Sequence, residues 1–141
     1  MQLNCPKCSE KFLKEGEMIP KVLDCGDSIC YKCLSSQKNE LIITCPKCQQ
    51  KSKTKLEEMP TNKNIFEFKE SISCFQCKEE YDTNYNSSLV PKILKCGDTL
   101  CSKCLKNLYK IIKICCPLCQ IKIDEDLIDI PNNKYVISIV I

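Results

Sequence analysis

The cysteines of this 141-residue chain stand at spacings that suit metal binding, and the pattern occurs twice. A ten-residue stretch that begins Cys-Gly-Asp, at 25–34, returns 71 residues later at 96–105. Each copy is preceded by a Cys-x-x-Cys pair and followed by a Cys-Pro-x-Cys pair. Fourteen of the fifteen cysteines fall into this register, and only Cys115 stands outside it.

Paired cysteines of this kind are typical of structural zinc sites, because thiolates bind Zn²⁺ and two pairs complete a tetrahedron. A secreted disulfide scaffold is the alternative for a small cysteine-rich chain. The odd number of cysteines, the proline inside the third pair and an N-terminus without an apolar signal segment all favour zinc. The sites are then closed, so we expect no catalytic residue that makes or breaks covalent bonds.

Each unit resembles a RING finger and is most similar to the RING domain that opens tripartite-motif ubiquitin ligases. In that family, ligands one, two, five and six hold one zinc ion, and ligands three, four, seven and eight hold another. The resemblance implies a small zinc-stabilised α+β fold with two tandem cross-brace RING-like domains, each with a short hairpin and one short helix. We expect the domains at 1–69 (unit one) and 70–141 (unit two), each with a trailing Pro-x-Asn segment.

Carried over residue by residue, the resemblance assigns four zinc ions per chain to four groups of ligands. In unit one the two sites take Cys5, Cys8, Cys30 and Cys33, and Cys25, Asp27, Cys45 and Cys48. In unit two they take Cys74, Cys77, Cys101 and Cys104, and Cys96, Asp98, Cys116 and Cys119.

The fourth ligand of each unit departs from the family, which usually has histidine there. This chain contains no histidine, and Asp27 and Asp98 occupy the position. A carboxylate oxygen can bind zinc at about 2.0–2.2 Å, so aspartate is a sound replacement. The same change in both units favours a working ligand over a random loss. For Cys115, two interpretations stay open: a buried small apolar residue, or an alternative ligand to Cys116.

Size and charge limit the function classes. Units of about 60–70 residues form only marginal apolar cores, so metal binding would supply part of the folding free energy. Fourteen thiolates remove fourteen charges and four Zn²⁺ ions add eight, which takes the formal charge from +3 to −3. A mildly acidic protein is not a general nucleic-acid binder.

No apolar run approaches the roughly 18 residues of a membrane span. We expect an intracellular protein, cytoplasmic or nuclear.

The resemblance implies a ubiquitin-protein ligase, or a ligase subunit, that binds ubiquitin and a ubiquitin-conjugating enzyme charged with it. Such a protein acts by positioning and has no covalent chemistry of its own. The alternative is a non-catalytic interaction or scaffold module. Two groove positions depart from active RING fingers: the usually aliphatic residue between ligands one and two is Lys7 or Gln76, and the arginine often found after the last ligand is Gln49 or Gln120.

Unit two keeps more of the apolar contacts expected at the docking groove. Leu108 and Leu118 stand where unit one has Gln37 and Lys47. We therefore predict that unit two binds the conjugating enzyme, through Gln76, Leu108, Pro117, Leu118 and Gln120. The alternative is that the two leucines face the core of unit two.

Apolar runs predict the secondary structure around the metal sites. Short strands are expected at 19–23 and 90–94, and an apolar stripe predicts a helix over 105–112. The last residues, 137–141, fit either a strand or the start of a helix.

The Pro-x-Asn segments are expected to join the two units. They lie at 59–65 and 130–136, each beside apolar residues, and related fingers dimerise through flanking segments. Tethering on one chain raises the effective concentration of the second unit. We therefore predict an internal pseudo-dimer.

Overall fold

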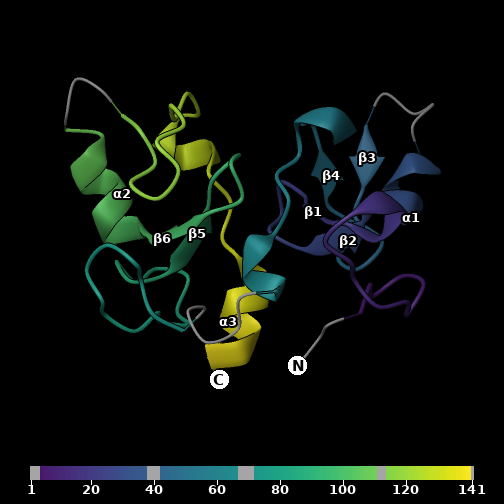
Figure 1. Ribbon diagram of the computed structural model, residues 1–141, viewed down its shortest axis with the longest axis horizontal. Coiled ribbons are helices and arrows are strands. Elements are labelled where there is room, and N and C mark those ends of the chain that lie inside the picture. Colours follow the sequence, from purple (N-terminus) through teal and green to yellow (C-terminus); the bar gives the residue numbers. More distant parts are fainter. Residues whose placement is uncertain (1–3, 38–41, 67–71, 111–113, 141) are drawn as a thin grey trace.

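The computed structural model describes residues 4–37, 42–66, 72–110 and 114–140. Unit one contains η1 (Gly16–Met18), β1 (Pro20–Val22), β2 (Ser28–Cys30), α1 (Tyr31–Ser35), β3 (Ile43–Thr44), β4 (Lys51–Ser52), η2 (Leu56–Glu58) and η3 (Lys63–Ile65). Unit two contains β5 (Pro91–Ile93), β6 (Thr99–Cys101), α2 (Ser102–Leu108), η5 (Leu127–Asp129) and α3 (Lys134–Val140). The two units form two lobes, and η3 and α3 lie between them (Figure 1). This is the small α+β architecture expected from the sequence.

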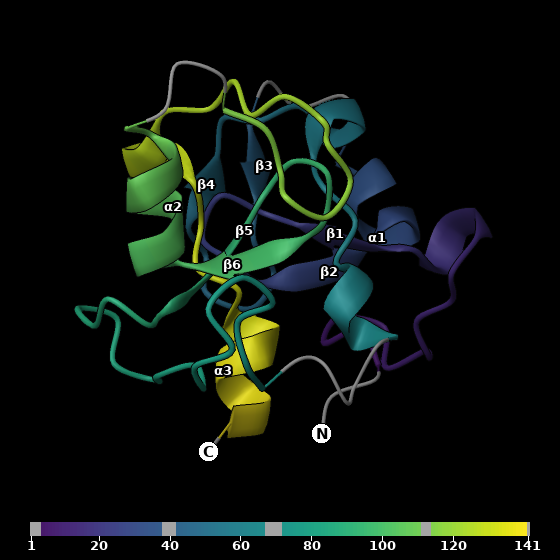
Figure 2. The same ribbon diagram turned by 60° about the vertical axis from the view of Figure 1, so that its left-hand side comes forward.

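A short antiparallel hairpin is the centre of each unit. β1 pairs with β2, with Pro20 opposite Cys30, and β5 pairs with β6 in the same register, with Pro91 opposite Cys101. The strands predicted at 19–23 and 90–94 are therefore confirmed, each shorter by a residue at both ends. Figure 2 shows the β5–β6 hairpin in front of the β1–β2 hairpin, with α3 below both.

The helices begin where a cysteine can cap them. The sulfur atom of Cys30 accepts a hydrogen bond from the Cys33 amide, and that of Cys101 accepts one from the Cys104 amide. Each of these cysteines therefore ends a strand and caps the helix that follows, α1 or α2. α2 ends at Leu108, earlier than the predicted helix over 105–112, and residues 111–113 lie outside the described part of the chain. The C-terminal segment is helical: α3 follows Asn133, whose side-chain oxygen accepts from the Val136 amide.

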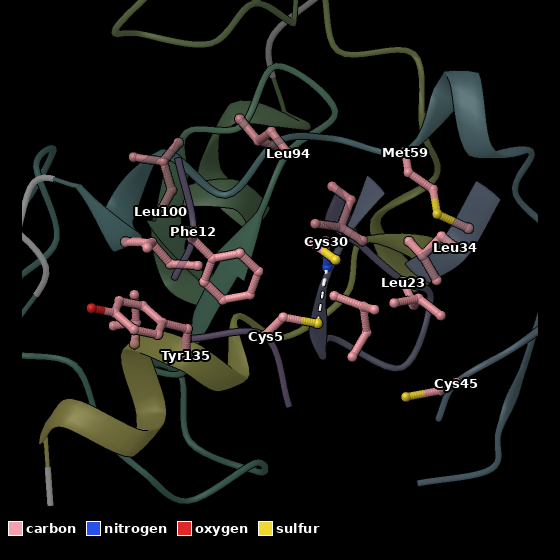
Figure 3. Close-up of a cluster of buried hydrophobic side chains, with 14 of the residues drawn as sticks. Cys5, Phe12, Leu23, Cys30, Leu34, Cys45, Met59, Leu94, Leu100 and Tyr135 are labelled. Carbon is pink, nitrogen blue, oxygen red and sulfur yellow. Dashed lines mark hydrogen bonds between the residues drawn. The ribbon is translucent and has the colours of Figure 1, made fainter. Parts of the chain in front are cut away.

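The core contains the cysteines as well as the large apolar side chains. Phe12 and Tyr81, at equivalent places in the two units, are both buried. Figure 3 shows Phe12 of unit one beside Tyr135 of α3, and the two side chains line the same small hollow. The core is thus shared between the units. Among the described residues, no helix is long and apolar enough to cross a membrane.

Each trailing segment first runs along the hairpin of its own unit. We call residues 59–66 tail one and residues 130–140 tail two. In tail one, Asn62 donates its amide to Pro20, and in tail two Asn133 donates to Pro91, at 2.9 and 2.8 Å. Both tails therefore extend their own hairpins before they reach the other unit.

The tails then meet in a buried contact between the units. Asn62 and Asn133 are fully buried. Asn62 Nδ2 donates to Asn133 Oδ1 at 2.9 Å, and Asn133 Nδ2 donates to Asn62 Oδ1 at 3.2 Å. This reciprocal pair confirms the predicted internal pseudo-dimer. The domain division at residue 69 or 70 lies outside the described residues and stays a prediction.

Two glycines let each tail approach the hairpin turn of the opposite unit. Gly26 and Gly97 have φ of 88° and 89°, in the left-handed region that glycine alone adopts easily. A Cβ atom at Gly26 would lie closer than 3.0 Å to the carbonyl oxygen of Asn132, and one at Gly97 equally close to that of Thr61. These positions need glycine for the backbone angle and for the contact with the other unit.

Candidate metal centres

The predicted ligands converge in four groups, each within one unit. The groups are Cys5, Cys8, Cys30 and Cys33; Cys25, Asp27, Cys45 and Cys48; Cys74, Cys77, Cys101 and Cys104; and Cys96, Asp98, Cys116 and Cys119. Within each group, one ligand atom per residue lies within 4.8 Å of all the others. The two groups of a unit interleave along the chain, as a cross-brace requires.

The all-cysteine groups have the dimensions of tetrahedral zinc sites. With Zn–S bonds of about 2.3 Å, two sulfur ligands of one ion stand about 3.8 Å apart. In unit one, the Sγ atoms of Cys5 and Cys33 are 4.0 Å apart, and those of Cys8 and Cys30 are 3.8 Å apart. The two corresponding distances in unit two are both 3.8 Å. Four thiolates at these distances fit Zn²⁺.

The aspartate groups fit equally well. A sulfur and a carboxylate oxygen on one zinc ion stand about 3.6 Å apart. Asp27 Oδ2 lies 3.4 Å from the Sγ atoms of both Cys25 and Cys45. In unit two, Asp98 Oδ2 lies 3.4 Å from the two equivalent sulfur atoms. The carboxylates therefore face the thiols at the place where the histidine ligand is usual.

Backbone amides stabilise thiolates in these sites. The amide of Cys30 donates to Cys5 Sγ at 3.5 Å, and that of Cys101 donates to Cys74 Sγ at 3.4 Å. Burial raises the pKa of Cys5, but the amides around its sulfur outweigh burial and lower this pKa to about 7. For Cys116, the hydrogen bond with Cys96 lowers the pKa to about 6 against the opposing effect of burial. Thiolates bind metal, so the ligand form is favoured at Cys5 and Cys116, whereas burial raises the pKa of other ligands, among them Cys25 and Cys45.

Lysine side chains form ion pairs with the two aspartates. Asp27 is almost fully buried, and Lys134 Nζ lies 3.2 Å from its Oδ2 and Lys47 Nζ 3.7 Å from its Oδ1. Burial raises the pKa of Asp27, but the hydrogen bond with Cys48 and the Lys134 ammonium bring it below its ordinary value. In unit two, Lys63 Nζ lies 3.6 Å from Asp98 Oδ1. The Asp27 carboxyl group is therefore held as a carboxylate.

Sequence reasoning missed these lysines as parts of the metal centres. Lys63 belongs to tail one and Lys134 to tail two, yet each contacts the aspartate of the other unit. Their spacing of 71 residues, the period of the repeat, was a signal that they share a role.

Cys115 belongs to none of the groups found among the described residues. It is half-buried and forms an isolated β-bridge with Lys122, while Cys116 joins the second group of unit two. This arrangement favours a packing role for Cys115 over a ligand role.

The predicted docking residues differ in exposure. Gln76, Leu118 and Gln120 are exposed, whereas Leu108 and Pro117 are half-buried. Leu108 packs against the core, as the alternative interpretation of the leucines proposed, but 42% of Leu118 is exposed.

Leu118 lines a hollow that both units build. The hollow has a volume of about 510 Å³, and Phe75 and Lys78 of unit two line it together with Lys63 and Asn64 of tail one. Gln76 and Leu108 are not among its lining residues, so the predicted docking set does not converge there.

Comparison with known proteins finds similarity to RING-type zinc fingers, which includes most of unit one. A family model of the RING-type zinc-finger matches residues 5–46. The human and mouse E3 ubiquitin-protein ligases TRIM32 are each 27% identical over 114 residues, covering 72% of this chain. The Caenorhabditis elegans E3 ubiquitin-protein ligase trim-21 is 34% identical over 47 residues, or 33% of this chain. In each case the match spans 16% of the relative's length.

The second unit repeats the first in motif, hairpin register and ligand geometry. The four groups fit zinc as the cofactor, with four sites per chain. The chain therefore carries tandem RING-type zinc fingers that resemble the RING domain of tripartite-motif ubiquitin ligases, with aspartate in place of the usual histidine ligand.

Proposed function

We propose that the chain is a ubiquitin-protein ligase, or a ligase subunit, that positions a ubiquitin-conjugating enzyme charged with ubiquitin. The observation that carries the proposal is the RING-type zinc finger at residues 5–46, in a chain similar to E3 ubiquitin ligases. Catalysis would come from holding the thioester and the attacking amine in a productive geometry. We place this activity inside the cell.

In this proposal the sixteen residues of the four groups ligate zinc, and the ions are structural. When bound, each ion fixes the loops of its finger and leaves no open coordination position for a substrate. The chain's own residues then act by binding and orienting protein partners. Because the cysteines of the four groups are zinc ligands in this proposal, none of them acts as a nucleophile.

We further propose that unit two provides the docking surface. Leu118 presents an exposed apolar side chain on the last Cys-Pro-x-Cys knuckle. Burying a leucine in an interface contributes roughly 1.5–3 kcal/mol. At the same position unit one has Lys47, whose ammonium lies 3.7 Å from the Asp27 carboxylate, so a partner would have to bury a charge there.

A non-catalytic scaffold is the second candidate, and one observation favours it. Gln76 and Gln120 are exposed and polar at two positions where active fingers usually offer an aliphatic side chain and an arginine. The Gln120 side chain donates to the Pro117 carbonyl of its own knuckle at 3.2 Å. The loss of an apolar contact and of an arginine would weaken the binding of a conjugating enzyme at this surface.

The test is an autoubiquitination assay with a panel of conjugating enzymes. Leu118→Lys should lower ubiquitin transfer at least tenfold, since it places a charge in the apolar contact. The matched control is Ile128→Lys, because Ile128 is an apolar residue of unit two that is 90% exposed and outside the proposed surface. Both variants should keep the zinc content of the wild type.

Equal activity of Leu118→Lys and the wild type would contradict the docking surface of unit two. Activity that survives this change but is lost when unit one is disrupted would show that unit one is the docking unit. No transfer with any conjugating enzyme, from a protein that holds four zinc ions, would favour the scaffold.

A further inference from the structure

Two lysines cross between the units and reach the aspartates of the opposite metal centres. Lys134 of tail two places its Nζ 3.2 Å from Asp27 Oδ2 in unit one. Lys63 of tail one places its Nζ 3.6 Å from Asp98 Oδ1 in unit two. The contacts are reciprocal, so each tail serves the metal centre of the other unit.

The packing of the tails fixes both lysines. Each lysine follows directly after one of the buried asparagines that pair across the interface, Asn62 and Asn133. The side-chain stem of Lys134 lies against Gly26, and that of Lys63 lies against Gly97. The ammonium groups reach the carboxylates only when the two units are packed together.

The charge of the aspartate ligand explains why a cation is needed. Zn²⁺ with three thiolates and a neutral histidine carries a net charge of −1, and aspartate in that position makes it −2. An ammonium group beside the carboxylate returns the local charge to −1. Lys134 also hydrogen-bonds to Asp27 Oδ2, whereas Lys63 is an ion-pair partner of Asp98 at 3.6 Å. Loss of a group that orients a metal ligand commonly lowers metal affinity about 10–100-fold.

We infer that Lys63 and Lys134 are positioning residues for the second zinc of the opposite unit, and that zinc affinity in each unit depends on the packing of the other. The inference rests on the ligand assignment proposed above. It couples zinc binding in the two fingers, because the lysine that offsets the charge of each aspartate comes from the tail of the other unit.

The two centres differ in how strongly they depend on the crossing lysine. Asp27 has a second cation, Lys47, from its own unit, and Leu118 stands at the equivalent position of unit two. In the part of the chain that the structure describes, Lys63 is the one ion-pair partner of Asp98. Loss of Lys63 should therefore weaken zinc binding more than loss of Lys134.

The experiment measures zinc transfer from the full-length chain to a chelating dye. Lys63→Met removes the charge and keeps a stem of similar length against Gly97. One of the four zinc ions should then bind about 10–100-fold more weakly. Lys63→Arg, which keeps the charge, should hold that ion more tightly than Lys63→Met.

A histidine background separates charge balance from packing. In Asp98→His the excess negative charge is gone, so adding Lys63→Met should leave the affinity within about threefold of the Asp98→His parent. If the lysine only packs the tail, Lys63→Met should lower the zinc affinity equally in the aspartate and histidine backgrounds. If Asp98→His does not fold, Asp27→His with Lys134→Met gives the same comparison in unit one.

Unchanged zinc affinity in Lys63→Met, or equal losses in the aspartate and histidine backgrounds, would overturn the inference. Wild-type protein that holds two zinc ions or fewer would instead refute the ligand assignment itself, which separates the two failures.

Discussion

Gly26→Ala should separate the two units, because the added methyl group meets the backbone of tail two. Two effects add at this position. A non-glycine residue in the left-handed region costs about 1–2 kcal/mol. The new Cβ would also lie closer than 3.0 Å to the carbonyl oxygen of Asn132, a backbone atom that no side-chain rotation can move away.

The second effect can be estimated from the contacts that would be lost. Relief of the clash requires tail two to move away from the hairpin turn. That movement breaks the hydrogen bond from the Lys134 amide to the Gly26 carbonyl and the two bonds between Asn62 and Asn133. Each bond contributes about 0.5–1.5 kcal/mol. With the backbone strain, Gly26→Ala should lower the free energy of unfolding by about 2.5–6.5 kcal/mol.

Gly16→Ala is the matched control. Gly16 also has a positive φ, 77°, but a Cβ atom there would meet nothing within 4 Å. It should lower the free energy of unfolding by only the strain of about 1–2 kcal/mol. Urea unfolding of the zinc-loaded proteins, followed by circular dichroism, compares the two variants, and metal analysis shows whether each still holds four zinc ions.

Equal destabilisation by Gly26→Ala and Gly16→Ala would refute the reasoning, since it would mean that the tail contact adds nothing. A Gly26→Ala protein that loses a zinc ion while its two units stay packed together, as solution scattering would show, would place the effect in the metal centre and not in the interface.

Other predictions concern the metal sites and the buried amides. Asp27→Ala should lower the zinc content from four ions to three, by metal analysis, whereas a content that stays at four would mean that another group completes the site. Removal of zinc with a chelator should abolish the folded signal in circular dichroism, because ligand binding supplies folding free energy, and a folded metal-free chain would contradict this. Asn62→Ala removes the two hydrogen bonds between Asn62 and Asn133 and should lower the free energy of unfolding, measured in urea, by about 1–3 kcal/mol. A change below 0.5 kcal/mol, within the usual range for surface sites, would show that the amide pair contributes little.

The sequence predicted the features that depend on local spacing. Repeated pairs of cysteines separated by two residues are typical of zinc knuckles, and the glycine after Cys25 or Cys96 marks a turn, so metal binding and the two hairpins could be anticipated. The grouping of the ligands and the aspartates as fourth ligands came from the resemblance to RING fingers, whose ligand positions could be carried over residue by residue. These inferences needed no knowledge of how the units pack.

Features that depend on packing could not be predicted in the same way. Residues 137–141 are an apolar run that fits a strand or a helix by periodicity alone. The capping oxygen of Asn133 and the contacts of α3 with β5 and η3 are long-range or side-chain features that select the helix. Likewise, Lys134 is 107 residues from Asp27, so no local pattern joins them.

One position shows why the two copies of the repeat are not interchangeable. After the proline of the last knuckle, unit one has Lys47 and unit two has Leu118. The lysine lies beside the Asp27 carboxylate, where it adds a second cation to a nearly buried metal centre. The leucine is exposed, and among the described residues the Asp98 beside it pairs with one cation, which comes from tail one. Unit two thus has an exposed apolar side chain where unit one has a lysine beside its metal centre. The proposed docking unit is therefore also the unit whose second zinc should depend most on its neighbour, so unit one would support the docking surface without forming it.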